Sequence, residues 1–229
     1  MRILFFDMEF ADGRVPGSIY SIGYVVTDGN FRIKKTATDL LINPESSWNS
    51  YVKKNILAYP IEEVRAAPNF PAHYKKIKKL FEKADVAIGF AVCNDTSALR
   101  KDCLRYQLEP ISYRYFDAEP VCRSLSHYQN ARGLAKCVED WCGEVPQNQH
   151  RSDGDAYATM RLMEAMCKAK HVTVEMMMEA YPECTGRSCA EKKRKRGFLG
   201  LFGRKKKTGE NQAYSNKTHQ RSKQHEKKH

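Results

Sequence analysis

Five side chains that can bind metal ions or move protons lie in three short stretches of the sequence. The first stretch holds Asp7 and Glu9, the second holds Asp95, and the third holds His150 and Asp155. Four carboxylates brought together without basic partners would repel one another, and hard divalent cations such as Mg²⁺ or Mn²⁺ relieve that repulsion. Two such ions, about 3.5–4 Å apart, would hold the attacking water and the leaving oxygen of a phosphodiester in line. A histidine, which ordinarily titrates near neutral pH, could accept the water's proton. These residue types therefore predict metal-dependent phosphodiester hydrolysis.

The first stretch is expected to be a buried strand over residues 2–10, because it is apolar, rich in aromatic residues and followed by a turn at Asp12 and Gly13. Side chains alternate between the two faces of a strand, so Asp7 and Glu9 share a face and lie about 6–7 Å apart. The same face carries Ile3 and Phe5. Two carboxylates on an apolar strand are costly unless a cation or a proton compensates them. The alternative is that both lie at a frayed, solvated strand end.

The other acidic residues lie where strands end and helices begin. Apolar, β-branched runs predict strands, and apolar residues at helical spacing predict helices. Asp95 follows a strand at 85–92 and is placed to cap a helix at 96–108, while Asp155 begins a further helix. Open α/β sheets carry their chemistry outside the carboxyl ends of their strands. The predicted fold is α/β, with a mixed sheet that starts with three antiparallel strands, at 2–10, 18–27 and 31–42.

The charge of the chain is concentrated at one end. The 229 residues have a formal net charge of +12, from 39 Lys and Arg against 27 Asp and Glu. Residues 187–229 contain 15 of the basic and 3 of the acidic residues, so the first 186 residues are electrically neutral. This break predicts one α/β domain over residues 1–186 and a basic, disordered tail over 187–229.

Composition also narrows the class of protein. No apolar run approaches the roughly 18–20 residues that a membrane span needs, and the first residues do not have the pattern of a signal peptide. The eight cysteines are scattered without a Cys-x-x-Cys pair, so we expect reduced core thiols rather than disulfides or a zinc site. A cytoplasmic protein is expected.

The three stretches together resemble the DEDD superfamily of 3′–5′ exonucleases, in its histidine-bearing branch (DEDDh, DnaQ-like). That branch includes proofreading subunits of bacterial replicative polymerases, RNase T and oligoribonuclease. The first motif is Phe6-Asp7-Met8-Glu9, the second is Asn94-Asp95, and the third is His150-Arg151-x3-Asp155-Ala156-x-Ala158-Thr159. The sister branch has a tyrosine four residues before the last aspartate, where this chain has Arg151. The resemblance covers roughly residues 1–170.

The resemblance implies an RNase H-like exonuclease fold and a 3′–5′ exonuclease that releases nucleoside 5′-monophosphates from single-stranded RNA or DNA. It implies two divalent ions, Mg²⁺ or Mn²⁺. Asp7, Glu9, Asp95 and Asp155 would be their ligands, and His150 the general base. This chain departs from many relatives before Asp95: they have Gly-His-Asn-x-x-Phe-Asp, and this chain has Gly89-Phe90-Ala91-Val92-Cys93-Asn94-Asp95, so the usual His and Asn are missing.

Two residues next to the first-motif carboxylates, Met8 and Phe10, are candidate substrate contacts. Phe10 could stack on a terminal base, as aromatic side chains do on single strands, or it could pack in the core.

Two alternatives for the function of the whole protein remain. One is a module of the same fold that binds nucleic acid or a partner without turnover. The other is a proofreading subunit, which would require a polymerase partner that the sequence does not indicate.

The tail has a basic cluster, Lys192-Lys193-Arg194-Lys195-Arg196, and a second one at 204–207, on either side of an apolar Phe-Leu-Gly-Leu-Phe segment. Such clusters release counterions from nucleic acid, and this is the interaction we favour. The alternatives are an anionic membrane surface, a protein partner, a nuclear-targeting signal, and a disordered segment that only adds solubility.

Overall fold

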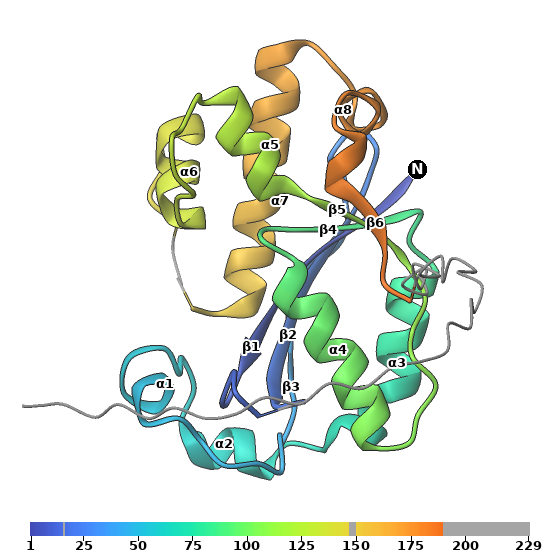
Figure 1. The fold of residues 1–229 in the computed structure, drawn as a ribbon, viewed down its shortest axis with the longest axis vertical. Coiled ribbons are helices and arrows are strands. Elements are labelled where there is room, and N and C mark those ends of the chain that lie inside the picture. The colour runs from blue at the N-terminus through green and yellow to red at the C-terminus, as the bar shows by residue number, and fades with distance from the viewer. Residues whose placement is uncertain (16, 147–149, 190–229) are drawn as a thin grey trace, which may run out of the picture. The chain divides into compact units, whose positions relative to one another are not determined.

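The computed structural model describes residues 1–15, 17–146 and 150–189. Its centre is a six-stranded sheet with the strand order β3-β2-β1-β4-β5-β6 (Figure 1). The strands are β1 (Arg2–Phe10), β2 (Ile19–Asp28), β3 (Ile33–Leu41), β4 (Val86–Gly89), β5 (Arg114–Asp117) and β6 (Thr185–Arg187). The first three are antiparallel neighbours, β4 and β5 run parallel to β1, and β6 runs antiparallel to β5. The predicted mixed sheet is confirmed, whereas β6 was not predicted.

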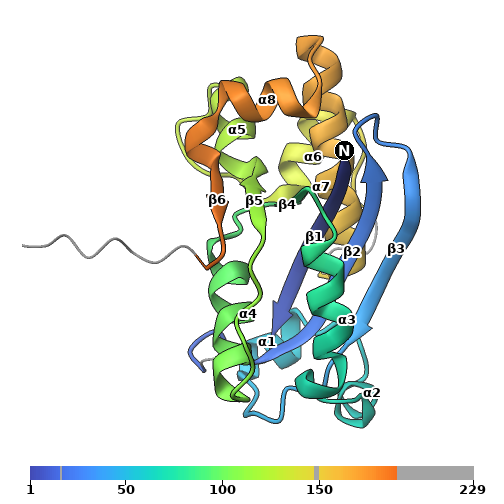
Figure 2. The same ribbon diagram turned by 90° about the vertical axis from the view of Figure 1, so that its right-hand side faces the viewer.

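Helices cover both faces of this sheet. The helices of the described residues are α1 (Ser50–Asn55), α2 (Ile61–Ala66), α3 (Phe70–Glu82), α4 (Cys93–Arg105), α5 (Ala118–Leu125), α6 (Leu134–Cys142), α7 (Ser152–Lys170) and α8 (Val174–Ala180), with a 3₁₀ turn at Pro182–Cys184. Helices α3 and α4 lie on one face, and α7 crosses the other with α5 and α6 beside it (Figure 2). Helix α7 therefore packs across β1 and β2, on the face that carries the candidate site.

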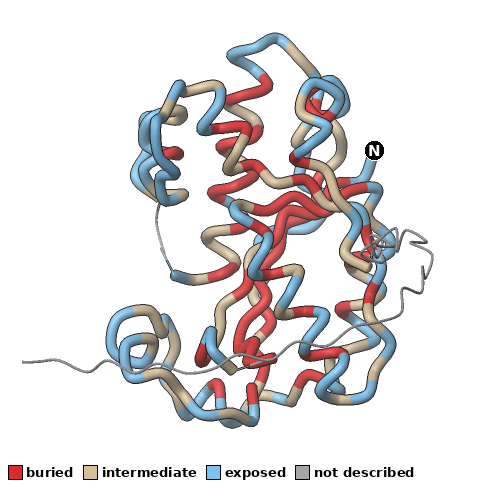
Figure 3. Tube along the Cα trace, viewed as in Figure 1, coloured by how far each residue is buried: buried red, intermediate tan, exposed pale blue. Residues whose placement is uncertain are grey.

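The side chains of β1 alternate between two cores, as the sequence predicts. Ile3 and Phe5 are fully buried with residues of α5, α6 and α7, while Leu4 and Phe6 are fully buried with residues of α3 and α4. The buried segments run through the middle of the sheet (Figure 3). Because strand residues alternate, Asp7 continues the row of Ile3 and Phe5 toward α7.

All eight cysteines are described and unpaired, and five of them are buried. Among the described helices, none combines the length and the apolar character needed to cross a membrane. The described residues all belong to one compact unit. The tail predicted from residue 187 begins too early, because Arg187 of β6 pairs with Arg114 of β5 and the backbone N–H of Tyr113 donates to Ser188 Oγ at 3.0 Å. From residue 190 the predicted disorder lies outside the described residues.

Candidate metal centre

Asp7 and Glu9 lie where the sheet opens beyond the end of β4. Strand β1 pairs with β4 only from Ile3 to Phe5, whereas its pairing with β2 continues past Asp7 and Glu9. Strand β4 ends at Gly89 and the chain turns away into α4. The two carboxylates thus lie in the crevice at the carboxyl end of a parallel strand pair, the usual place for a site in an α/β sheet.

Helix α7 brings the third carboxylate to the same place. Gly23 of β2 is paired with Asp7, and the backbone of Ser152, the first residue of α7, lies directly on it. Asp155 is in the first turn of this helix. Asp7, Glu9 and Asp155 each offer a carboxylate oxygen, and the three oxygens lie within 4.8 Å of one another. The structure therefore places together three acidic residues that are far apart in the sequence.

Asp95 approaches from α4 and is buried, with 5% of its surface exposed. The prediction that Asp95 caps this helix is wrong, since α4 begins at Cys93 and Asp95 lies inside its first turn. The helix starts earlier because the Asp117 carboxylate accepts hydrogen bonds from the backbone N–H groups of Ala91 (2.8 Å) and Val92 (3.1 Å). Asp95 is not one of the three residues whose oxygens meet within 4.8 Å, but its charge raises the pKa of Asp7 and of Glu9.

The four carboxylates hold protons more tightly than free carboxylates do. Burial, together with the nearby charges of Asp95, Glu9 and Asp155, raises the pKa of Asp7 well above its ordinary value. Burial and then Asp155 raise the pKa of Glu9 to about 8, burial and then Asp117 raise that of Asp95 to about 8, and burial raises that of Asp155 to about 6. Within residues 1–15, 17–146 and 150–189, none of the four forms an ion pair with Lys or Arg.

An oxygen-only donor set without a basic partner suits hard divalent cations. Such cations bind carboxylates, and they would replace the protons that these groups otherwise retain. The structure thus supports a cluster able to hold a divalent ion, built on Asp7, Glu9 and Asp155 with Asp95 adjacent.

His150 lies at the entrance to α7, two residues before its first residue. The backbone N–H of His150 donates to Oδ2 of Asp155 at 3.2 Å, and the side chain is exposed. Its φ of 66° is a left-handed conformation that non-glycine residues seldom adopt. The backbone of His150 is therefore held beside Asp155, and the residue is exposed to solvent.

A fifth carboxylate, Asp39 of β3, lies behind the cluster and was not predicted. Asp39 is paired with Gly23, which is in turn paired with Asp7, so the three residues form one row across the sheet. The charge of Asp39 adds to the raised pKa of Asp7 and of Glu9. No motif marks Asp39 in the sequence, because only the strand register aligns it with Asp7.

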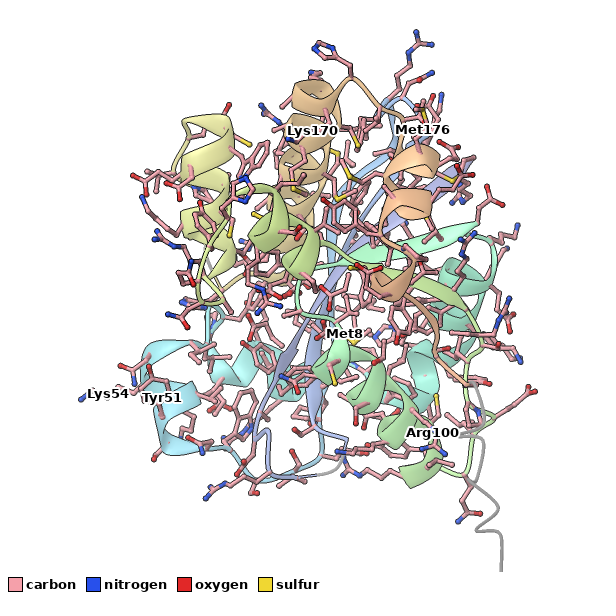
Figure 4. All side chains as sticks on the ribbon, turned by 45° about the horizontal axis from the view of Figure 1, so that its top comes forward. Met8, Tyr51, Lys54, Arg100, Lys170 and Met176 are labelled. Atoms are coloured by element: carbon pink, nitrogen blue, oxygen red, sulfur yellow. The ribbon has the colours of Figure 1, made fainter. Side chains whose placement is uncertain are left out.

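The two candidate substrate contacts have different surroundings. Met8 is buried, 3% exposed, in the core with α3 and α4 (Figure 4), so its placement does not support a contact between its side chain and substrate. Phe10 is half-buried and lines a cavity of about 170 Å³ together with Asn94, Ser97 and Lys101. Phe10 also packs against the core that contains α3 and α4, so the structure supports the packing role considered from sequence, and stacking on a base stays a prediction. The predicted tail contacts, Lys192 to Arg196, lie outside the described residues.

Comparison with protein families matches residues 4–163 to the RNase_T family, described as an exonuclease. A search of curated proteins finds no match.

Solved structures similar to this chain include two exonucleases. One is E. coli Exonuclease I in complex with a dA16 oligonucleotide, with 18% identity and a TM-score of 0.66 over 78% of this chain and 42% of that one. The other is a 3′-exonuclease in a structure of the 3′-end specific recognition of histone mRNA stem-loop, with 14% identity and a TM-score of 0.57 over 75% of this chain and 84% of that one. The chain matches less than half the length of Exonuclease I. These likenesses confirm the predicted RNase H-like exonuclease fold.

Proposed function

We propose that this chain, which belongs to the RNase_T family of exonucleases, is a divalent-metal-dependent 3′–5′ exonuclease of the histidine-bearing branch. It would act on single-stranded RNA or DNA and release nucleoside 5′-monophosphates. The observation that carries the proposal is the meeting of Asp7, Glu9 and Asp155 within 4.8 Å, without a basic partner among the described residues. Structural ion-pair networks neutralise buried carboxylates with Lys or Arg, whereas metal centres leave them for the cation.

Each residue of the site has a part in this proposal. Asp7, Glu9, Asp95 and Asp155 would hold two Mg²⁺ or Mn²⁺ ions, which when bound activate the attacking water and stabilise charge on the leaving oxygen. His150, exposed beside Asp155, would remove the proton from the attacking water. Phe10 would support the base of the terminal nucleotide by stacking, because it lines the cavity next to Asn94.

The tail would strengthen the binding of substrate. Its cluster from Lys192 to Arg196 is separate in sequence from the neutral first 186 residues, and basic segments of this kind bind phosphates with a strong dependence on salt. We propose that it contacts nucleic acid outside the catalytic site.

The test is digestion of matched 5′-labelled single-stranded RNA and DNA in Mg²⁺ or Mn²⁺ by the wild type, by Asp7→Asn and by Asp140→Asn. Asp140 is a surface residue of α6 that pairs with Lys136, so it serves as a control for the loss of a carboxylate. We expect the wild type and the control to shorten the strands from the 3′ end, and Asp7→Asn to leave them intact. If neither strand is cut while both are bound, the proposal is wrong and a binding module takes its place.

A further inference from the structure

Three hydroxyl groups from three parts of the chain converge on Asp39. Ser152 Oγ donates to Asp39 Oδ1 at 2.8 Å, Ser21 Oγ donates to the same oxygen, and the Tyr59 hydroxyl donates to Oδ2. Ser21 and Ser152 are fully buried and their hydroxyls lie within hydrogen-bonding distance of each other. Both oxygens of Asp39 are thus occupied by protein groups. The carboxylate joins β2 and β3 to the first residue of α7 and to the segment between α1 and α2.

At the start of α7, the hydrogen bond between Ser152 and Asp39 takes the place of an ordinary helix cap. Helix α7 follows Arg151, whose side chain makes no capping hydrogen bond. The side chain of Ser152 instead points to the sheet and binds Asp39. His150 lies two residues before Ser152, and Asp155 lies three residues after it, in the same turn. A shift of Ser152 would therefore move both residues relative to Asp7 and Glu9.

Tyr59 holds the same segment from its other side. The Arg151 guanidinium lies over the ring of Tyr59, 5.0 Å from its centroid, and it pairs with Asp153 at 3.2 Å. Ser152 thus contacts Asp39 directly, and Arg151 is connected to Asp39 through Tyr59. Asp153 joins this network through its ion pair with Arg151.

Asp39 also acts on the cluster through its charge. It is not one of the three residues whose oxygens meet, yet it lies in the same row across the sheet as Asp7, with only Gly23 between them. A fixed negative charge beside a cation site favours the bound cation, and partners behind the ligands commonly orient them.

We propose that Asp39 is a positioning residue of the metal centre. It fixes the first turn of α7 so that Asp155 and His150 face Asp7 and Glu9, and its charge strengthens the binding of divalent cations. The inference rests on the proposed function, but its test does not depend on cleavage alone.

The experiment uses the full chain with Asp39→Ala, Asp39→Asn and, as a control on the same strand, Thr36→Ala, whose side chain is exposed. Mn²⁺ binding is measured by titration calorimetry without nucleic acid, and kcat and KM are measured on a single-stranded substrate. For Asp39→Ala we expect the Mn²⁺ affinity and kcat each to fall by about 10- to 100-fold, with little change in KM. Asp39→Asn keeps an oxygen for Ser152 but loses the charge, so it should recover much of kcat while its Mn²⁺ affinity stays low.

Three comparisons decide the result. If Asp39→Ala has wild-type Mn²⁺ affinity and kcat, the inference about Asp39 is wrong. The proposed function is then judged separately, and it is retained if Asp155→Ala loses activity. If the wild type cleaves nothing, the proposed function fails and the Mn²⁺ affinities still decide the role of Asp39. If Asp39→Ala does not fold, Asp39→Asn and Tyr59→Phe decide instead. Weakened Mn²⁺ binding at a wild-type unfolding temperature supports the inference, and wild-type values in both variants overturn it.

Discussion

Gly23 of β2 and Ser152 of α7 touch backbone to backbone: a Cβ built on Gly23 would lie 1.8 Å from the carbonyl carbon of Ser152. Because Gly23 is paired with Asp7 on one side and Asp39 on the other, the start of α7 lies over the row that joins them. The missing side chain of one glycine thus lets a carboxylate from α7 reach two carboxylates on β1.

Replacing Gly23 with Ala should therefore displace the start of α7. The added methyl group has backbone as its neighbour, which cannot move aside as the end of a flexible side chain can. We expect the free energy of unfolding to fall by about 1–3 kcal/mol, as for other overpacked sites, together with a loss of Mn²⁺ affinity. Urea denaturation and metal titration measure both effects.

Gly133→Ala is the matched control, because nothing lies within 4 Å of a Cβ at that position. If Gly23→Ala were as stable as this control and bound Mn²⁺ equally well, the close packing of α7 on β2 would not be needed for the site.

Without divalent cations, the acidic cluster should make stability depend on pH. The pKa of Glu9 is about 8 in the folded protein and near 4.5 when it is free, so between these values the folded state binds more protons than the unfolded state. Stability contributed by this group is therefore present at low pH and is lost as pH rises toward 8. In EDTA, the wild type should lose stability relative to Glu9→Gln between pH 5 and pH 8.

Added Mg²⁺ or Mn²⁺ should reverse that loss, since a cation replaces the protons on the carboxylates. The rise in unfolding temperature on adding the metal should be larger at pH 8 than at pH 5, and it should be small in Glu9→Gln. An equal rise at both pH values would mean that metal binding and protonation do not compete at this cluster.

His150→Ala should reduce kcat without releasing the metal. His150 meets Asp155 through its backbone N–H, which alanine retains, so the carboxylates should keep their positions. Loss of a general base commonly costs about 10²- to 10⁴-fold in rate. Single-turnover cleavage and Mn²⁺ titration separate the two effects, and a variant that loses both would point to a role for the histidine ring in building the site.

Changing Lys192, Lys193, Arg194, Lys195 and Arg196 together to Gln should weaken substrate binding at low salt and leave kcat unchanged. For single strands, each lost phosphate contact reduces the slope of log affinity against log salt concentration by about 0.7. This slope is measured by binding titrations between about 50 and 200 mM salt.

The control replaces Lys75, Lys76 and Lys79 of α3 with Gln, because all three residues are exposed on that helix. An unchanged salt slope in the tail variant, with reduced binding to anionic lipid vesicles, would favour the membrane alternative for the tail.

The local sequence pattern determined much of this fold. The alternation of residues 2–10 placed Asp7 and Glu9 on one face because strand side chains have a period of two, and the structure has that arrangement. Asp155 was placed in the first turn of its helix for a similar local reason, the start of an apolar helical stripe after a polar loop. These properties depend on residues within a few positions of each other.

Tertiary structure decided what depends on distant partners. Helix α4 begins at Cys93 because Asp117, 22 residues after Asp95, binds the turn before it, and this placed Asp95 inside the helix. Strand β6 is three residues long and needs β5 to pair with, so its own sequence carries too little signal. The register of three strands brings Asp39 level with Asp7, and the bare backbone of Gly23 admits α7 between them. The sequence thus determined which residues could bind a metal ion, and only long-range packing decided how they meet.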